Sequence, residues 1–167
     1  MSIFELNLTM LSTNNFYMKK SFLPLLFFCS IFVTAQNKIN QPDAILGTWL
    51  TGSGKGKVNI YKNGDVFFGK IVWLKNPTYE DGKQKVDKNN PDESKRNSPL
   101  MGLNMLKEFK YDKNNKWING KIYDPENGKE YSCTITLREE KLMDVRGYIG
   151  ISLIGRTDTW FRVADIK

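Results

Sequence analysis

The sequence predicts an all-β fold: an eight-stranded up-and-down antiparallel barrel, with a two-sheet β-sandwich as the alternative. Short segments of β-type residues recur along the chain with turn residues between them, and no long stretch has helical periodicity. The clearest strand is 131–138, where Tyr131, Cys133, Ile135 and Leu137 alternate with polar residues. Period two over eight residues is typical of a half-buried strand.

Eight segments have strand character: 45–51, 58–62, 66–74, 103–111, 117–123, 129–138, 141–149 and 155–163. Asn63-Gly64 lies between the second and third segments and predicts a tight hairpin, because both residue types tolerate positive φ. The turn residues of 124–128 predict a second hairpin. Successive hairpins indicate a meander, and eight meandering strands close most simply into a barrel without exposed edges.

Two short stretches interrupt the regular strand pattern. Asn119-Gly120 has too little strand before it for a hairpin and predicts a bulge. Residues 100–106 fit either a short helix or the start of a strand, because Leu100, Leu103 and Leu106 share a helical face.

The N-terminal region predicts export. Lys19 and Lys20 precede an apolar run over 22–33, which is too short to span a bilayer, and short residues lead to a cleavage site between Ala35 and Gln36. The expected organisation is an N-terminal extension 1–17 upstream of the true start at Met18, a signal peptide 18–35, and a single barrel domain 36–167 with a long loop 75–99. The expected location is periplasmic or secreted.

Composition limits the chemistry of the expected domain. The chain has no histidine, which removes the commonest general base and zinc ligand, and we expect no catalytic residues, no metal and no cofactor. After cleavage Cys133 is the single cysteine, so no intramolecular disulfide forms, and its place on an apolar strand face indicates core packing. The net charge of +7 comes from scattered lysines, which indicates a solvated basic surface or weak attraction to an anionic envelope, and not nucleic-acid binding.

Loop 75–99 is unusually long for a connection inside a compact domain. Connections of this length are functional lids or flexible segments, and both readings stay open. Asp87-Lys-Asn-Asn-Pro-Asp92 within it has Pro91 at the fifth position and no glycine at the sixth, which excludes a calcium loop of the EF-hand type. The glycine-rich stretch 52–57 leads into a strand, so it predicts a hairpin loop and not a phosphate-binding loop.

Charged residues alternate within otherwise apolar strands near the end of the sequence. Arg146 and Tyr148 share one strand face, and Arg156 and Trp160 share another. An arginine pointing into a barrel needs an internal carboxylate or a bound ligand; the alternatives are an exposed pair or an arginine packed on tryptophan. The candidate ligand-binding residues are Trp73, Tyr123, Asp124, Arg146, Tyr148, Arg156 and Trp160.

Two resemblances support this reading. Gly47-Thr48-Trp49 resembles the Gly-x-Trp signature of lipocalin-like barrels, in which a basic residue of the last strand packs across the tryptophan; Arg156 or Arg162 could fill that role. The expected domain also resembles the bacterial exported family named domain of unknown function 2147. The matching segments are 47–49, 69–74, 87–91, 99–103, 120–125, 145–148 and 155–160. Ser98 departs from the family, which often has arginine there, and the family brings no established activity.

Binding is therefore expected rather than catalysis. The leading hypothesis is an exported barrel that holds a small amphipathic or anionic molecule, with the arginines near its head group and loop 75–99 over the mouth. The first alternative is a structural protein that docks on another envelope component, with peripheral envelope association. The second is a weak enzyme that uses carboxylates such as Asp124.

Overall fold

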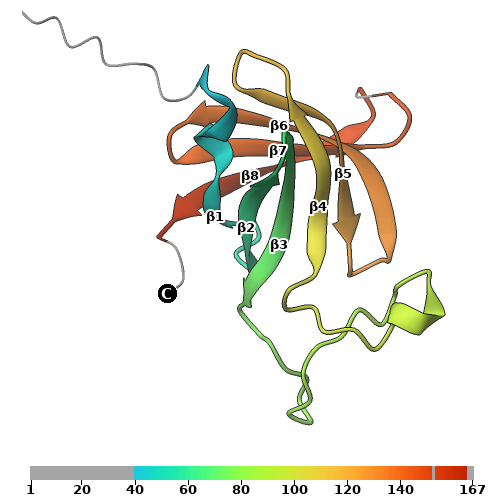
Figure 1. Cartoon of the computed structure of the whole chain (residues 1–167). Helices are drawn as coiled ribbons and strands as arrows, with labels where there is room; N and C mark the ends of the chain where they lie inside the picture. Colours follow the sequence, from blue (N-terminus) through green and yellow to red (C-terminus); the bar gives the residue numbers. More distant parts are fainter. Residues whose placement is uncertain (1–39, 152, 165–167) are drawn as a thin grey trace, which may run out of the picture. The chain divides into compact units, whose positions relative to one another are not determined.

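The computed structural model describes residues 40–151 and 153–164, and the expected extension and signal peptide lie outside them. The described residues form a closed antiparallel barrel, as Figure 1 shows, which confirms the predicted barrel over the sandwich. Its strands are β1 (Gly47–Leu50), β2 (Gly56–Asn63), β3 (Val66–Leu74), β4 (Asn104–Tyr111), β5 (Lys116–Asp124), β6 (Lys129–Glu139), β7 (Leu142–Tyr148) and β8 (Gly155–Val163).

Each strand pairs with its neighbour in sequence, and the barrel closes where β1 pairs with β8. The closing register places Thr48 opposite Val163 and Trp49 opposite Arg162. Among the eight described strands, closure leaves no edge open to pairing with another chain.

The turns follow the predicted chemistry. The hairpin between β2 and β3 turns at Gly64, whose φ of 60° lies in the left-handed region, and Asp124 pairs with Lys129 across the predicted β5–β6 turn. Asn119 has a φ of 59° at a register shift in β5, which confirms the bulge. Residues 100–103 form turns before β4, so the helical alternative for 100–106 is wrong.

The first predicted strand begins two residues late. Ile45 ends a short 3-10 helix, η2 (Pro42–Ile45), which starts with proline where no backbone donor is needed. A second short helix, η3 (Glu93–Lys95), lies in the long loop. Within the described ranges, no helix is long and apolar enough to cross a membrane.

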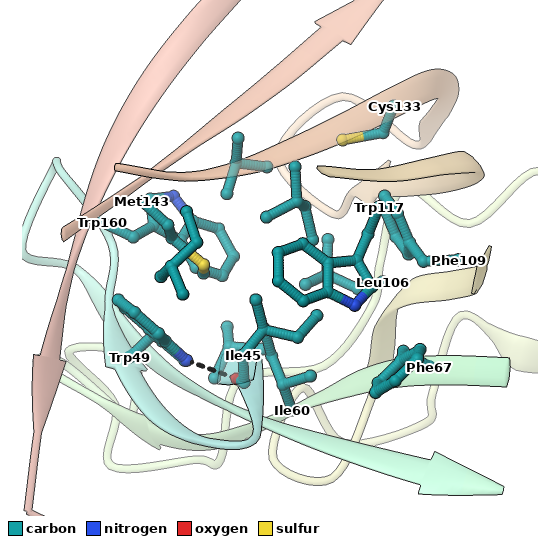
Figure 2. Close-up of a cluster of buried hydrophobic side chains, with 14 residues drawn as sticks. Ile45, Trp49, Ile60, Phe67, Leu106, Phe109, Trp117, Cys133, Met143 and Trp160 are labelled. Atoms are coloured by element: carbon teal, nitrogen blue, oxygen red, sulfur yellow. Dashed lines mark hydrogen bonds between the residues drawn. The ribbon is translucent and has the colours of Figure 1, made fainter. Parts of the chain in front are cut away.

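The core fills the end of the barrel under η2. Trp49, Trp117 and Trp160 are fully or almost fully buried there with Phe67 and Phe109, as Figure 2 shows. The Trp49 Nε1 donates a hydrogen bond of 2.9 Å to the carbonyl of Ile45, which fixes η2 over the core. Aromatic side chains of this size supply much of a small barrel's buried apolar area.

Arg162 holds the closing strand to the first strand. Its guanidinium stacks on the Trp49 ring at 4.3 Å and donates to the carbonyl oxygens of Ala44, Leu46 and Glu140. Arg162, and not Arg156, therefore fills the role that the resemblance to lipocalin-like barrels implies.

Glycine allows two strands to approach the core closely. A Cβ on Gly120 would lie 2.4 Å from the Phe109 ring, and one on Gly69 would lie 2.8 Å from Leu106. Both distances are far below van der Waals contact, so these inner positions accept no side chain without repacking.

Candidate functional site

The two ends of the barrel carry different kinds of connection. In a meander, alternate connections lie at the same end, which places the β1–β2, β3–β4, β5–β6 and β7–β8 connections together (Figure 1). We call this end the mouth. The β2–β3, β4–β5 and β6–β7 turns at the opposite, closed end are short, whereas the β3–β4 connection spans residues 75–103.

A cavity of about 1260 Å³ opens at the mouth. Its inner wall is apolar and comes from several strands, above Trp160. The apolar side chains that line it are Val58, Ile71, Leu74, Leu100, Met105, Ile122, Val145 and Trp160. A concave apolar wall with polar groups around its opening is the usual form of a small-molecule site.

Residues 75–99, which we call the flap, are built into the mouth. Isolated bridges pair Thr78 with Gln84 and Val86 with Pro99. The Lys85 carbonyl accepts a hydrogen bond of 3.0 Å from the Leu100 amide, and the Lys85 amide donates one of 2.9 Å to the Pro77 carbonyl. Flap residues such as Tyr79 and Val86 line the cavity. The flap therefore has regular internal structure and contributes to the cavity wall.

A buried hydrogen bond ties the flap to the barrel. Asp87 is fully buried, and its carboxylate accepts a hydrogen bond of 2.8 Å from the Tyr123 hydroxyl on β5 and one of 2.6 Å from Asn90. Burial, and then this bond to Asp87, raise the pKa of Tyr123 to about 12. Tyr123 thus keeps its proton and remains a donor to Asp87 well above neutral pH.

A second contact seats the flap on the β5–β6 turn. The Asn89 amide donates to the carbonyl oxygens of Pro125 and Glu126, at 3.2 and 2.8 Å. A Cβ on Gly128 would lie only 1.9 Å from the Asn89 carbonyl oxygen, and Gly128 has a φ of 70°. Both the close approach and the positive φ require glycine at this position.

Cationic side chains outnumber anionic ones in the cavity lining. The cationic lining residues are Lys55, Lys75, Lys85, Lys88 and Arg156, and the anionic ones are Asp124, Glu126 and Asp158.

The three carboxylates all have partners within the protein. Asp158 accepts from the Trp160 Nε1 at 2.8 Å, Glu126 pairs with Lys55 at 2.6 Å, and Asp124 accepts from turn residues. Lys75, Lys85 and Arg156, in contrast, form no ion pair with any residue in the described ranges. The five cationic and three anionic side chains together leave the cavity lining with a net positive charge.

The structure brings together five of the seven residues proposed from the sequence. The residues among the cavity lining are Tyr123, Asp124, Tyr148, Arg156 and Trp160. Arg156 is on the same inward face of β8 as Asp158 and Trp160, and it pairs with Gly147 on β7.

Arg146 and Trp73 lie outside the cavity. Arg146 neighbours the inward residues Val145 and Gly147, so its side chain faces outward, where it donates to the Thr157 hydroxyl at 3.0 Å. Trp73 packs under the Lys57 ammonium, 5.0 Å from the ring centroid. A register shift between Lys57 and Val58 reverses the alternation in β3, so that Leu74 lines the cavity and Trp73 does not.

Sequence reasoning missed the flap anchors. Asp87 and Asn89 fall in a stretch unsuited to calcium and in a family motif, and Asp87 is one of several loop carboxylates; none of these features predicts an anchor. Lone polar residues in a long loop give no periodicity, and only burial identifies Asp87 as an anchor. In the described ranges, no group of three histidine, cysteine, aspartate or glutamate side chains is arranged to hold a metal ion.

Cys133 is part of the core and not of the cavity wall. Its side chain is fully buried, and burial raises the pKa of its thiol to about 12. A buried neutral thiol with this pKa is a poor nucleophile and packs as a small apolar side chain.

Comparisons with known proteins agree with this geometry. A family model described as an uncharacterized protein conserved in bacteria (DUF2147) matches residues 47–162. No curated protein sequence matches the chain significantly. A solved structure of protein HP1028 from the human pathogen Helicobacter pylori, which belongs to the lipocalin family, is similar with a TM-score of 0.63 and 21% identity. The similarity covers 72% of this chain and 83% of that one, and at this identity it shows the fold alone.

Proposed function

This chain belongs to the DUF2147 family of uncharacterized bacterial proteins and folds as a lipocalin-like barrel, and from that premise we propose that it is an exported protein that binds a small amphipathic molecule with an anionic head group. The ligand would enter the mouth and lie with its apolar part against the inner wall of the barrel. The protein acts as a carrier or receptor, without chemical change to the ligand.

The observation that carries the proposal is the pairing of an apolar cavity with uncompensated cations at its opening. The volume of about 1260 Å³ exceeds the roughly 300–1000 Å³ of ordinary small-molecule pockets, so a chain-like molecule can fit. Val58, Ile71 and Val145 would contact the apolar part. Burying that part supplies about 0.8 kcal/mol for each methylene.

The head group would lie near Arg156 and Lys85. Arg156 projects from the inward face of β8 at the mouth, and Lys85 is half-buried on the flap. A carboxylate or phosphate can accept two parallel hydrogen bonds from a guanidinium, which gives orientation as well as affinity. The cavity lining holds five cationic and three anionic side chains, so a net positive charge remains for an anionic head group.

A carboxylate-based enzyme has less support. Asp124 accepts from the Glu126 amide and the Asn127 side chain, as expected for a turn residue. Asp87 is buried and already accepts hydrogen bonds from Tyr123 and Asn90. Both carboxylates already accept hydrogen bonds within the protein, so binding is the better-supported function.

The binding proposal is tested first with two matched ligands. Isothermal titration calorimetry compares dodecanoate with dodecanol on protein purified from its own host. We expect dodecanoate to bind at least tenfold more tightly, and Arg156→Gln to reduce that preference more than it reduces dodecanol binding. Native mass spectrometry of the same preparation should show a bound small molecule. Absence of binding by both ligands, with a mass spectrum of the empty protein alone, would contradict the proposal.

A cavity-filling variant tests where the ligand lies. A Cβ on Gly147 would make only ordinary contacts, the nearest at 3.4 Å from Ile122, so Gly147→Ile should fold and project into the cavity. We expect it to abolish dodecanoate binding. Ser132→Ile adds the same side chain on the exposed outer face of β6 and should bind normally. Equal binding by both variants would place the ligand elsewhere.

Export has a separate test. Tandem mass spectrometry of the N-terminal peptide of the protein recovered from the envelope or medium of its host should identify Gln36, free or cyclised to pyroglutamate, as the first residue. An N-terminus at Met1 or Met18 would contradict the proposed cleavage. It would not affect the binding proposal, which the ligand experiments test separately.

A further inference from the structure

The β7–β8 connection exposes an unusual number of large apolar side chains. Ile149, Ile151, Leu153 and Ile154 are 69%, 61%, 84% and 69% exposed, although they lie within six residues of one another. Single exposed aliphatic residues are normal on a protein surface, but a cluster of this kind marks an interaction site. We call residues 149–151, 153 and 154 the apolar tip.

The apolar tip is held by specific hydrogen bonds. The Ile149 amide donates to the Ile154 carbonyl at 3.3 Å, and the Ile154 amide donates to the Ile151 carbonyl at 3.1 Å. From the outer face of β7, the Arg146 guanidinium donates to the Leu153 carbonyl at 3.4 Å and to Thr157. These bonds hold the backbone of the apolar tip in a turn that leaves its large apolar side chains exposed.

The apolar tip is continuous with the mouth. Ile149 and Ile154 are among the residues that line the cavity, as are the unpaired cations Lys75, Lys85 and Arg156. Apolar side chains that project beyond a basic surface match the membrane interface, where acyl chains lie beneath anionic head groups.

We propose that the apolar tip inserts into the interface of a bilayer that contains anionic lipids and so turns the mouth of the barrel toward the membrane. Ile151 and Leu153 enter between the acyl chains, while the mouth cations lie at the level of the head groups. The inference goes beyond the proposed function, because it requires no ligand in the cavity and would hold for an empty barrel.

A second copy of the chain fits this surface less well than a bilayer does. Stable protein interfaces bury about 800 Å² on each partner, far more than a tip of five residues can supply. Two copies that meet by their mouths would also bring unpaired cations of both together, which is unfavourable. A fluid bilayer closes around a small convex tip and provides the complementary charge.

The test is flotation with lipid vesicles, using protein purified from its own host. We expect the protein to float with vesicles of phosphatidylcholine and phosphatidylglycerol, at least tenfold more than with phosphatidylcholine alone, and to be released by high salt. The double variant Ile151→Ser/Leu153→Ser should reduce flotation at least tenfold. Both residues lie outside the cavity lining, so this variant should bind dodecanoate as the wild type does.

Matched variants make the test specific. Phe161→Ser removes an apolar side chain that is 47% exposed on the outer wall, and it should float normally. A triple variant removes the mouth cations, and a matched triple variant removes lysines near the closed end. The substitutions are Lys75→Gln, Lys85→Gln and Arg156→Gln at the mouth, and Lys110→Gln, Lys116→Gln and Lys141→Gln at the other end. Only the first set should reduce flotation on anionic vesicles.

Three results would overturn the inference: no flotation of the wild type, equal flotation of the wild type and the double variant, or equal losses from the two triple variants. Sedimentation velocity tests the alternative partner. If the wild type is a dimer and the double variant is a monomer, the apolar tip binds a second copy of the chain and not a membrane. Failure of dodecanoate binding alone would contradict the proposed function and leave this inference standing.

Discussion

The closed end and the mouth of the barrel are built from the same eight strands but in opposite ways. At the closed end, aromatic side chains fill the interior, η2 covers it, and short turns connect the strands. At the mouth, the interior is a cavity, the β3–β4 connection is long, and Lys75, Lys85 and Arg156 form no ion pair within the described residues. The packed core and the open cavity are therefore separated along the barrel axis.

Strand β8 contributes one arginine to each end of the barrel. Arg162 packs on Trp49 and donates to three backbone carbonyls, whereas Arg156 faces the cavity mouth. The two residues are about 20 Å apart along the strand, since each residue of a strand adds about 3.4 Å. The same residue type on one strand therefore closes the barrel at one end and lines the cavity at the other.

The largest effect is expected from Trp49→Ala at the closed end. Removing this fully buried ring should lower the free energy of unfolding by about 4 kcal/mol, because a large cavity remains in the core. Trp73→Ala, on the outer wall, should cost about 1 kcal/mol or less. Urea denaturation of both variants measures the contrast. Similar losses would show that the core does not dominate stability.

Arg162→Met should have the next largest effect. It removes a charged donor from three carbonyl oxygens, and the expected loss is about 3 kcal/mol in the free energy of unfolding. Arg162→Lys should recover only part of it, because an ammonium lacks the planar fork of a guanidinium. Arg156→Met is the matched change at the mouth, and it should leave the urea midpoint unchanged while it weakens dodecanoate binding.

Tyr123→Phe should loosen the flap with a smaller effect on the barrel. The variant leaves the buried Asp87 carboxylate without its 2.8 Å donor, which costs about 1–3 kcal/mol locally. Amide hydrogen exchange should increase at Asp87 and Leu100, while the amides of β6 and β7 keep their protection. Uniform acceleration across the barrel would show that flap and core open as one unit.

The stability of the flap should fall, and not rise, at high pH. The folded pKa of Tyr123 is raised to about 12, above its ordinary value of 10, so the stability from its protonated hydroxyl is complete below pH 10. It is lost as the pH rises through 12. Flap exchange, corrected for its intrinsic pH dependence, should increase over that interval in the wild type and not in Tyr123→Phe.

The smallest effect is expected at the exposed pair of Lys55 and Glu126, which spans the mouth at 2.6 Å. Both side chains are about two-thirds exposed, and surface pairs of this kind contribute little. Lys55→Met should leave the urea midpoint unchanged. A clear destabilisation would show that the mouth loops contribute more to stability than the contrast between the ends allows.

The sequence was sufficient to predict the barrel because its signals are local. Alternation around Cys133, the hairpin residues at Gly64 and the bulge at Asn119 each depend on a few neighbouring residues. The start of β1 was missed for a related reason. Ile45 is apolar and buried like a strand residue, and only its backbone geometry places it in η2.

The site was only partly predictable because it depends on direction and on distant contacts. One bulge in β3 turns Trp73 outward, and alternation alone could not decide whether β7 or β8 presented its arginine to the interior. The contact of Asp87 with Tyr123 joins residues 36 positions apart. No periodic pattern encodes such a contact, so it appears only when the chain is folded.

The pairing of β1 with β8 also determines when the barrel can be completed during folding. Arg162 bonds to the carbonyl of Leu46, 116 positions earlier in the chain, and β1 has its second neighbour only when β8 is present. Hairpins have local contacts and can form early in folding, but the core under η2 cannot be sealed until the last strand pairs with the first. A polypeptide that stops before Phe161 keeps two open strand edges and an uncovered Trp49, features that promote aggregation and degradation. Barrel closure therefore depends on a complete β8, and truncation within that strand would leave the core open.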